Sequence, residues 1–106
     1  MMEKPNKLYL KQLSDGDIVF ENQIISIIKK EFPVEVLEYQ NSINTSNFLK
    51  TAENVHKLKH KISILGLEKG YQLASKFEKE LKSGMKIQQI SFEKILNEIS
   101  VYLNTI

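Results

Sequence analysis

One histidine, His56, combines the residue type and the surroundings that nucleophilic chemistry needs. The apolar stripe of its segment is Val55, Leu58, Ile62 and Leu65. At about 100° per residue around a helix, the centre of this stripe lies about 130° from His56, so the imidazole is predicted to face solvent. An unperturbed histidine is largely neutral at neutral pH, and its bare nitrogen can attack an electrophile without a separate base.

A carboxylate at Glu78 is placed to orient that ring. The segment that carries His56 and the next helical segment are expected to form a hairpin that turns near Leu67, and His56 and Glu78 each lie eleven positions from Leu67. In an antiparallel hairpin, the two side chains would lie at the same level along the helix axes. A carboxylate that accepts from Nδ1–H would fix the tautomer and leave Nε2 pointing outward. Lys82, four residues after Glu78, is an alternative partner for the carboxylate.

Lysines dominate the segment around His56. Against one acid, Glu53, there are four of them: Lys50, Lys57, Lys59 and Lys61. Lys59, one turn along the same face, is predicted to offset the charge of a phosphoryl group on His56, and the basic patch favours an acidic protein surface as partner. The chain has no arginine and a net charge of only +2, so nucleic acid is not expected as a partner.

The spacing of His56 and His60, four residues apart, is also typical of metal-binding pairs on helices. Glu53 could add a third ligand, but the nearby lysines disfavour a cation. No metal site and no cofactor are therefore expected. The chain has no glycine-rich phosphate loop, no serine or cysteine nucleophile with a base, and no second carboxylate suited to acid–base work, so it is not expected to be an enzyme.

Apolar residues at steps of three and four dominate the N-terminal half and predict helices. A short helix is expected over residues 8–13, followed by turn and capping residues at 14–17. The inward stripe of the next helix is expected to be Phe20, Ile24, Ile27 and Ile28. Because proline is favourable at the first position of a helix, Pro33 is expected to begin a new helical piece after a bend near Phe32.

Three further helices are expected in the C-terminal half. The first is capped by Ser46 or Asn47 and ends at Gly66, the second closes at residues 83–84, and the third begins between residues 87 and 91. Short connections between helices of similar length favour antiparallel neighbours. The expected fold is all-α, an antiparallel up-and-down four-helix bundle with a short extra N-terminal helix, in one domain of residues 1–106.

Composition indicates a folded protein of the cytoplasm. The apolar fraction is 42% and the charged fraction 26%, close to the average for globular proteins. There is no cysteine, so neither a disulfide scaffold nor a thiolate metal site is possible. No apolar run is long enough to span a bilayer, and residues 1–6 lack the hydrophobic centre of a secretory signal. No membrane partner is expected, and the expected location is cytoplasmic.

The motif around His56 resembles the signature of histidine-containing phosphotransfer domains of bacterial two-component phosphorelays. It reads His56-Lys57-Leu58-Lys59, followed by Leu65-Gly66. The resemblance extends over most of the chain through Gly16-Asp17 with Phe20, Phe32-Pro33 with Leu37, and Phe77-Glu78.

The resemblance implies that His56 accepts a phosphoryl group from the aspartyl phosphate of a receiver domain, such as that of a hybrid sensor histidine kinase, and passes it to a response-regulator receiver. Glu78 would orient the imidazole, and Lys59 would be the nearby cation. Magnesium is expected on the partner receiver, which supplies its own acidic pocket. The surface expected to bind the partner consists of Lys57, His60, Lys61 and Ser63.

Position 60 departs from the family pattern, which usually has glycine one turn after the acceptor, whereas this chain has His60 followed by Lys61 and Ile62. A bulky side chain there could hinder the approach of a receiver or restrict which receivers fit. This departure leaves an alternative hypothesis open. In it, the chain is a helical adaptor that docks on a receiver domain or a kinase without carrying phosphate.

Overall fold

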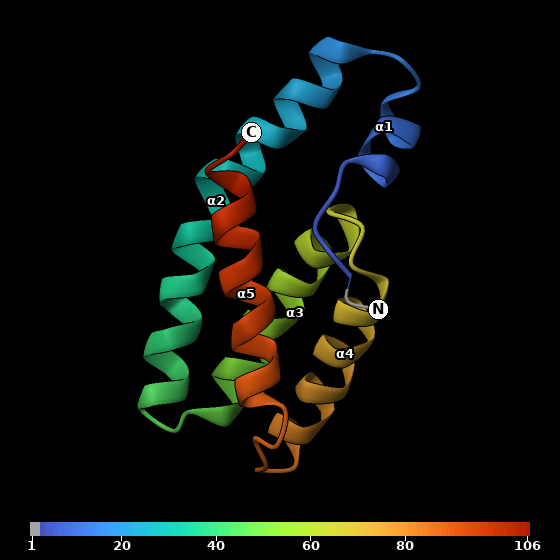
Figure 1. Cartoon of the computed structure of the whole chain (residues 1–106). Helices are drawn as coiled ribbons and strands as arrows, with labels where there is room; N and C mark the ends of the chain where they lie inside the picture. The colour runs from blue at the N-terminus through green and yellow to red at the C-terminus, as the bar shows by residue number, and fades with distance from the viewer. Residues whose placement is uncertain (1–2) are drawn as a thin grey trace.

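The computed structural model describes residues 3–106 and shows an all-helical protein (Figure 1). The five helices are α1 (Leu8–Ser14), α2 (Ile18–Asn44), α3 (Phe48–Ile64), α4 (Glu68–Lys82) and α5 (Gln89–Leu103). No strand occurs in the described part of the chain. The expected all-α class and the short extra helix at the front are therefore confirmed. The first two residues of the expected domain lie outside the described residues.

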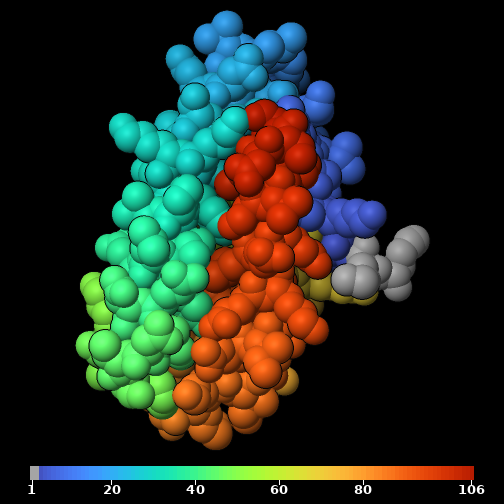
Figure 2. Space-filling model, turned by 60° about the vertical axis from the view of Figure 1, so that its left-hand side comes forward, coloured from blue at the N-terminus to red at the C-terminus, as the bar shows by residue number. Residues whose placement is uncertain are grey.

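Helices α2, α3, α4 and α5 share one hydrophobic core. Its largest fully buried side chains are aromatic, and their rings pack against one another: Tyr39, Phe77 and Phe92. Figures 1 and 2 show α5 lying beside α2, where the Tyr39 hydroxyl group lies 2.9 Å from the Glu93 carboxylate. Burial and the neighbouring carboxylate raise the pKa of Tyr39 far above its ordinary value, so it remains a hydrogen-bond donor.

The turns are formed by the residues that the sequence predicts. Asn47 caps α3 by accepting from the Lys50 backbone N–H, and α3 gives way to α4 at Gly66, which has a positive φ of 82°. A Cβ at Gly66 would lie 2.6 Å from the Asn6 side chain, and the Asn6 backbone N–H donates to the Leu65 carbonyl group. The N-terminal segment thus covers the α3–α4 turn, which sets the register of these two helices.

The expectation that Pro33 begins a new helix is wrong, because α2 continues through it from Ile18 to Asn44. A proline inside a helix costs about 3 kcal/mol, since it lacks the N–H that would bond to the carbonyl group of residue 29. Phe32 and Tyr39 are almost completely buried on either side of it. Burial of two such side chains outweighs the local cost of the proline.

The expected inward stripe at the start of α2 is only partly correct. Ile28 is buried, but Phe20 and Ile27 are about half exposed, as is Leu13 of α1. Figure 1 gives the reason, since the N-terminal part of α2 extends past the end of α5 and has only α1 beside it. Over residues 3–106, no helix combines the length and the apolar character needed to cross a membrane.

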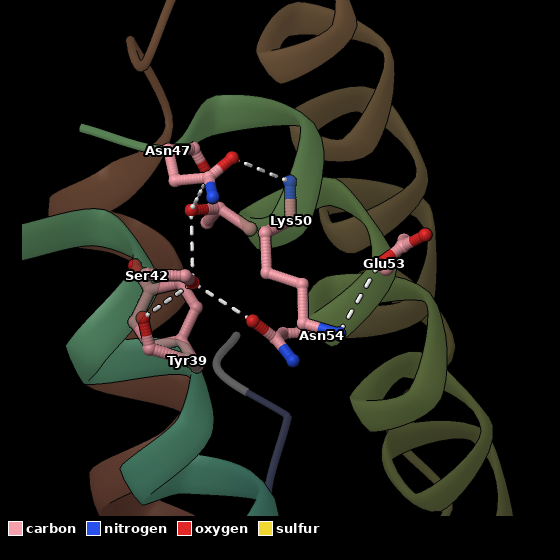
Figure 3. A network of polar contacts seen from close by, with 7 residues as sticks. Tyr39, Ser42, Asn47, Lys50, Glu53 and Asn54 are labelled. Carbon is pink, nitrogen blue, oxygen red and sulfur yellow. Dashed lines mark hydrogen bonds and ion pairs between the residues drawn. The ribbon is translucent and has the colours of Figure 1, made fainter. Parts of the chain in front are cut away.

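A buried polar network joins α2 to α3 (Figure 3). The Ser42 hydroxyl group lies 2.8 Å from the Asn54 side-chain oxygen and accepts from the Thr51 hydroxyl group at 2.9 Å. All three side chains are buried, and Thr51 is completely inaccessible. Because each hydroxyl group has a partner, the network fixes the register of these helices without leaving a buried polar group unpaired.

Candidate functional site

His56 projects outward from α3 between two core residues. Val55 and Leu58 are completely buried, whereas the side chain of His56 is 53% exposed. This follows from the helical period, since the apolar stripe that fixes α3 in the core leaves residue 56 on the opposite side. The prediction that the imidazole faces solvent is confirmed.

Glu78 reaches His56 from the neighbouring helix α4. The residue before it, Phe77, is fully buried and holds α4 in the core, while the side chain of Glu78 is 12% exposed. The His56 Nδ1 atom lies 3.2 Å from both carboxylate oxygens. The predicted meeting of ring and acid is therefore observed. Because both carboxylate oxygens lie at the same distance from one ring nitrogen, the carboxylate fixes the orientation of the ring as well as its position along the helix.

Two lysines also bind Glu78. The Lys59 ammonium group lies 3.0 Å from Oε1 of Glu78 and 5.5 Å from the centre of the Tyr71 ring, and its side chain is only 13% exposed. Lys82 lies 3.4 Å from Oε2, so the alternative pairing within α4 occurs together with the pairing to His56. The charge of Lys59 is thus directed at the carboxylate, whereas the sequence led us to expect it beside a phosphoryl group.

These contacts keep Glu78 ionised. Partial burial by itself would raise its pKa, but the hydrogen bonds from Lys59 and His56 outweigh burial and lower the pKa below its ordinary value of 4.5. An ionised carboxylate can only accept hydrogen bonds, so Nδ1 of His56 carries the proton. Nε2 of the neutral ring then holds a lone pair that faces away from α4.

No family model, no curated protein and no solved structure matches the chain. What the site can do is therefore inferred from its own residues. They provide one accessible nitrogen nucleophile and one carboxylate that orients it. Among residues 3–106, no group of three or more His, Cys, Asp or Glu side chains is arranged to hold a metal ion, and His56 and His60 are a pair without a third ligand.

The remaining predicted partner-binding residues lie in different places. His60 is exposed, and its ring packs perpendicular to that of His56 with 5.0 Å between ring centres. Lys57 is exposed and lines a hollow beside His56. Ser63 is half-buried and lies two helical turns beyond His56 on the same face of α3, in a different hollow shared with Tyr9 of α1.

Lys61 does not lie beside His56, because α2 binds it. Its ammonium group lies 3.0 Å from Glu31 and 2.9 Å from Glu35, and its side chain is 12% exposed. Burial would lower the pKa of Lys61, but the two carboxylates outweigh burial and raise it. The sequence-based picture of a basic patch surrounding His56 is thus corrected, since Lys59 and Lys61 are both neutralised by acids on neighbouring helices.

The hollow beside His56 includes an apolar residue that the sequence analysis missed. Its lining is Leu49, Ala52, Glu53, His56, Lys57, Glu78 and Lys82. Leu49 is 69% exposed, although it follows the core-facing Phe48. The signal that could have found it is its position seven residues before His56, which is two helical turns and therefore the same face. An apolar contact beside the nucleophile is available to a docking protein.

Proposed function

We propose that the chain is a histidine phosphotransfer protein, in which His56 accepts a phosphoryl group from a receiver-domain aspartyl phosphate and passes it to another receiver. The observation that carries the proposal is the half-exposed imidazole whose Nδ1 lies 3.2 Å from both oxygens of Glu78. This arrangement gives the chain an oriented nucleophile without a complete active site, as a carrier requires and a self-sufficient enzyme does not.

The transfer step uses only groups that the two proteins provide. The lone pair of Nε2 attacks phosphorus, the N–P bond forms, and the P–O bond to the aspartate breaks, so the aspartate leaves as a carboxylate. The Nδ1 proton stays on the ring, which becomes positively charged beside the Glu78 carboxylate. Lys59 assists through Glu78, which it holds ionised and in place. Magnesium belongs to the receiver.

The relative directions of the helices are part of the same proposal. We infer that α2, α3, α4 and α5 form an antiparallel up-and-down four-helix bundle. Short connections between these helices and a common core support this arrangement. So does the pairing of His56 with Glu78, because residues equidistant from Leu67 meet when the chain reverses direction there. The expected cytoplasmic location is also part of the proposal, since receiver domains and hybrid kinases act there.

The proposed partners are receiver domains of response regulators and of a hybrid sensor histidine kinase. The surface beside His56 offers apolar contact at Leu49 and positive charge at Lys57 and Lys82. Acidic receivers would be attracted by those two lysines, and an apolar side chain of the receiver would cover Leu49.

The test is to incubate the protein with a phosphorylated receiver domain and to follow acid-labile phosphate on wild type, His56→Ala and a control variant. Lys76→Ala is a suitable control, because Lys76 is exposed on α4 away from the hollow. We expect label on wild type and on the control, and none on His56→Ala. Equal labelling of wild type and His56→Ala would refute the proposal.

The adaptor alternative is favoured by one observation, the His60 ring packed against His56. If this ring blocks the approach of a receiver, the protein docks without taking phosphate. Calorimetry would then detect binding of a receiver to wild type with no labelling of His56, and His60→Gly would restore labelling. Labelling of wild type would contradict the adaptor.

A further inference from the structure

The group that would hold a phosphoryl group on His56 is not Lys59. Its ammonium group bonds to Oε1 of Glu78 at 3.0 Å and is largely covered. Glu78 also faces Nδ1 of His56, so Lys59 lies towards the Nδ1 edge of the ring. A phosphoryl group would be attached at Nε2, on the other edge. The nearest lysine in the helical pattern therefore faces the wrong edge of the imidazole.

Two other lysines near the site are also bound by acids. Lys82 bonds to Glu78, and Lys61 bonds to two acids on α2. Lys57 is exposed and lines the hollow beside His56, but it lies one residue along the chain, about 100° around the helix from His56. The residue in ring contact with His56 is His60, whose ring stands perpendicular to that of His56 with a centre-to-centre distance of 5.0 Å.

Helix geometry places His60 towards the free edge of His56. Residues four apart share a face, and side chains on a helix lean towards its N-terminus, so His60 leans over the turn that carries His56. Glu78 on α4 occupies the Nδ1 edge, which leaves Nε2 as the ring edge open to a neighbour on α3. The His60 imidazole is exposed, so it can adjust its rotamer without disturbing the core.

We propose that His60 holds the phosphoryl group after transfer: its ring N–H donates to a phosphoryl oxygen bound to Nε2 of His56. This inference rests on the proposed phosphotransfer function and assigns a further group to the same site. A hydrogen bond to a charged oxygen is stronger than one between neutral groups, so it stabilises the phosphorylated form relative to the free form. In that role His60 stabilises the bound phosphoryl group, whereas the adaptor hypothesis treats it as an obstacle.

The experiment loads phosphate without a partner protein. Phosphoramidate donates a phosphoryl group directly, because Nε2 forms the N–P bond as the P–N bond of the donor breaks and ammonia leaves. Phosphorus NMR then measures how much phosphohistidine accumulates and its half-life after the donor is removed. The variants are His60→Ala, which removes the donor, and His60→Gln, which keeps an N–H donor, with Lys76→Ala as the control.

We expect His60→Ala to shorten the half-life of phospho-His56 by about fivefold or more, the scale of one lost hydrogen bond to a charged group. His60→Gln should recover most of the loss, and the control should match wild type. Equal half-lives in wild type and His60→Ala, or a longer half-life in His60→Ala, would overturn the role of His60 and leave the proposed function standing.

Failure of the proposed function gives a different result. If wild type and His56→Ala accumulate the same phosphorus signal, His56 is not the acceptor and both proposals fall. A long-range proton–nitrogen NMR spectrum of the His60 ring adds a readout that a merely structural residue would not change. Phosphorylation should shift the ring nitrogens of His60 in wild type, and an unchanged spectrum would contradict the contact.

Discussion

The two sides of α3 carry polar contacts of opposite kinds. Towards α2, Ser42, Thr51 and Asn54 form a neutral, buried network in which the hydroxyl groups are paired. Towards α4, His56 and Glu78 form a charged contact that is half open to solvent. A closed neutral network has no group left to react, so its role is to fix the register of α2 against α3. An open contact with a lone pair facing outward can serve chemistry.

Substitutions on the two sides of α3 are therefore expected to have separable effects. Substitutions towards α2 should lower the free energy of unfolding and leave phosphorylation of the folded protein intact. Substitutions towards α4 should slow phosphorylation and leave unfolding nearly unchanged.

The largest expected effect on chemistry is that of Glu78→Gln. The variant loses the charged acceptor that holds Nδ1–H, so the rate of phosphoramidate labelling should fall about 10- to 100-fold, as expected for a lost hydrogen bond to a charged group. The matched control is Glu38→Gln, an exposed carboxylate on α2, which should label at the wild-type rate. Labelling of Glu78→Gln at the wild-type rate would mean that the carboxylate does not orient the ring.

On the other side of α3, Asn54→Ala should lower the free energy of unfolding by about 1–2 kcal/mol, because it removes a buried side chain whose oxygen lies 2.8 Å from the Ser42 hydroxyl group. Urea denaturation measures the loss. Asn97→Ala, an exposed site on α5, is the control and should stay within about 0.5 kcal/mol of wild type. The two sides of α3 would not have separable roles if Asn54→Ala slowed labelling of the folded protein and left its stability unchanged.

Lys61→Met tests a charged contact on the α2 side of α3. We expect a loss of about 1–2 kcal/mol in urea denaturation at pH 7, since Glu35 loses its partner, and no change in labelling. The raised pKa of Lys61 means that its contribution is fully present below 10.5 and is lost only above that value. The control is Lys50→Met, whose exposed pair with Glu53 contributes little. Equal losses in both variants would contradict this assignment.

The smallest predicted effect is a pH dependence at Glu78. Its pKa is lowered in the folded protein, so its contribution to stability is present above the ordinary value of 4.5 and is lost as pH falls through the lower folded value. The difference in unfolding free energy between wild type and Glu78→Gln should therefore shrink in acid. A difference that grows below pH 4.5 would have the wrong sign.

The sequence predicts the α4 side of the site better than the α2 side, for a physical reason. His56 and Glu78 are joined by one short turn at Gly66, so their register follows from counting residues. Lys61 meets Glu31 across an equally short connection, residues 45–47, and both residues lie fifteen positions from Ser46, so the same counting pairs them. The pairing was missed because the expected bend near Phe32 would separate Glu31 from the helix that holds Glu35, whereas α2 is continuous and carries both acids opposite Lys61.

Helix boundaries show the same limit. The cap at Asn47 and the end of α3 near Gly66 depend on local residues, and both were predicted. The continuation of α2 through Pro33 depends on burial of Phe32 and Tyr39, which only the packed core provides. Local propensity gives way where tertiary packing is strong.

A long-range proton–nitrogen NMR spectrum of the imidazole shows whether Glu78 fixes the tautomer of His56. At a pH where the ring is neutral, the spectrum should show the proton on Nδ1 and a bare Nε2 in wild type. In Glu78→Gln this preference should be lost. A proton on Nε2 in wild type, or the same spectrum in both proteins, would mean that Glu78 does not fix the tautomer.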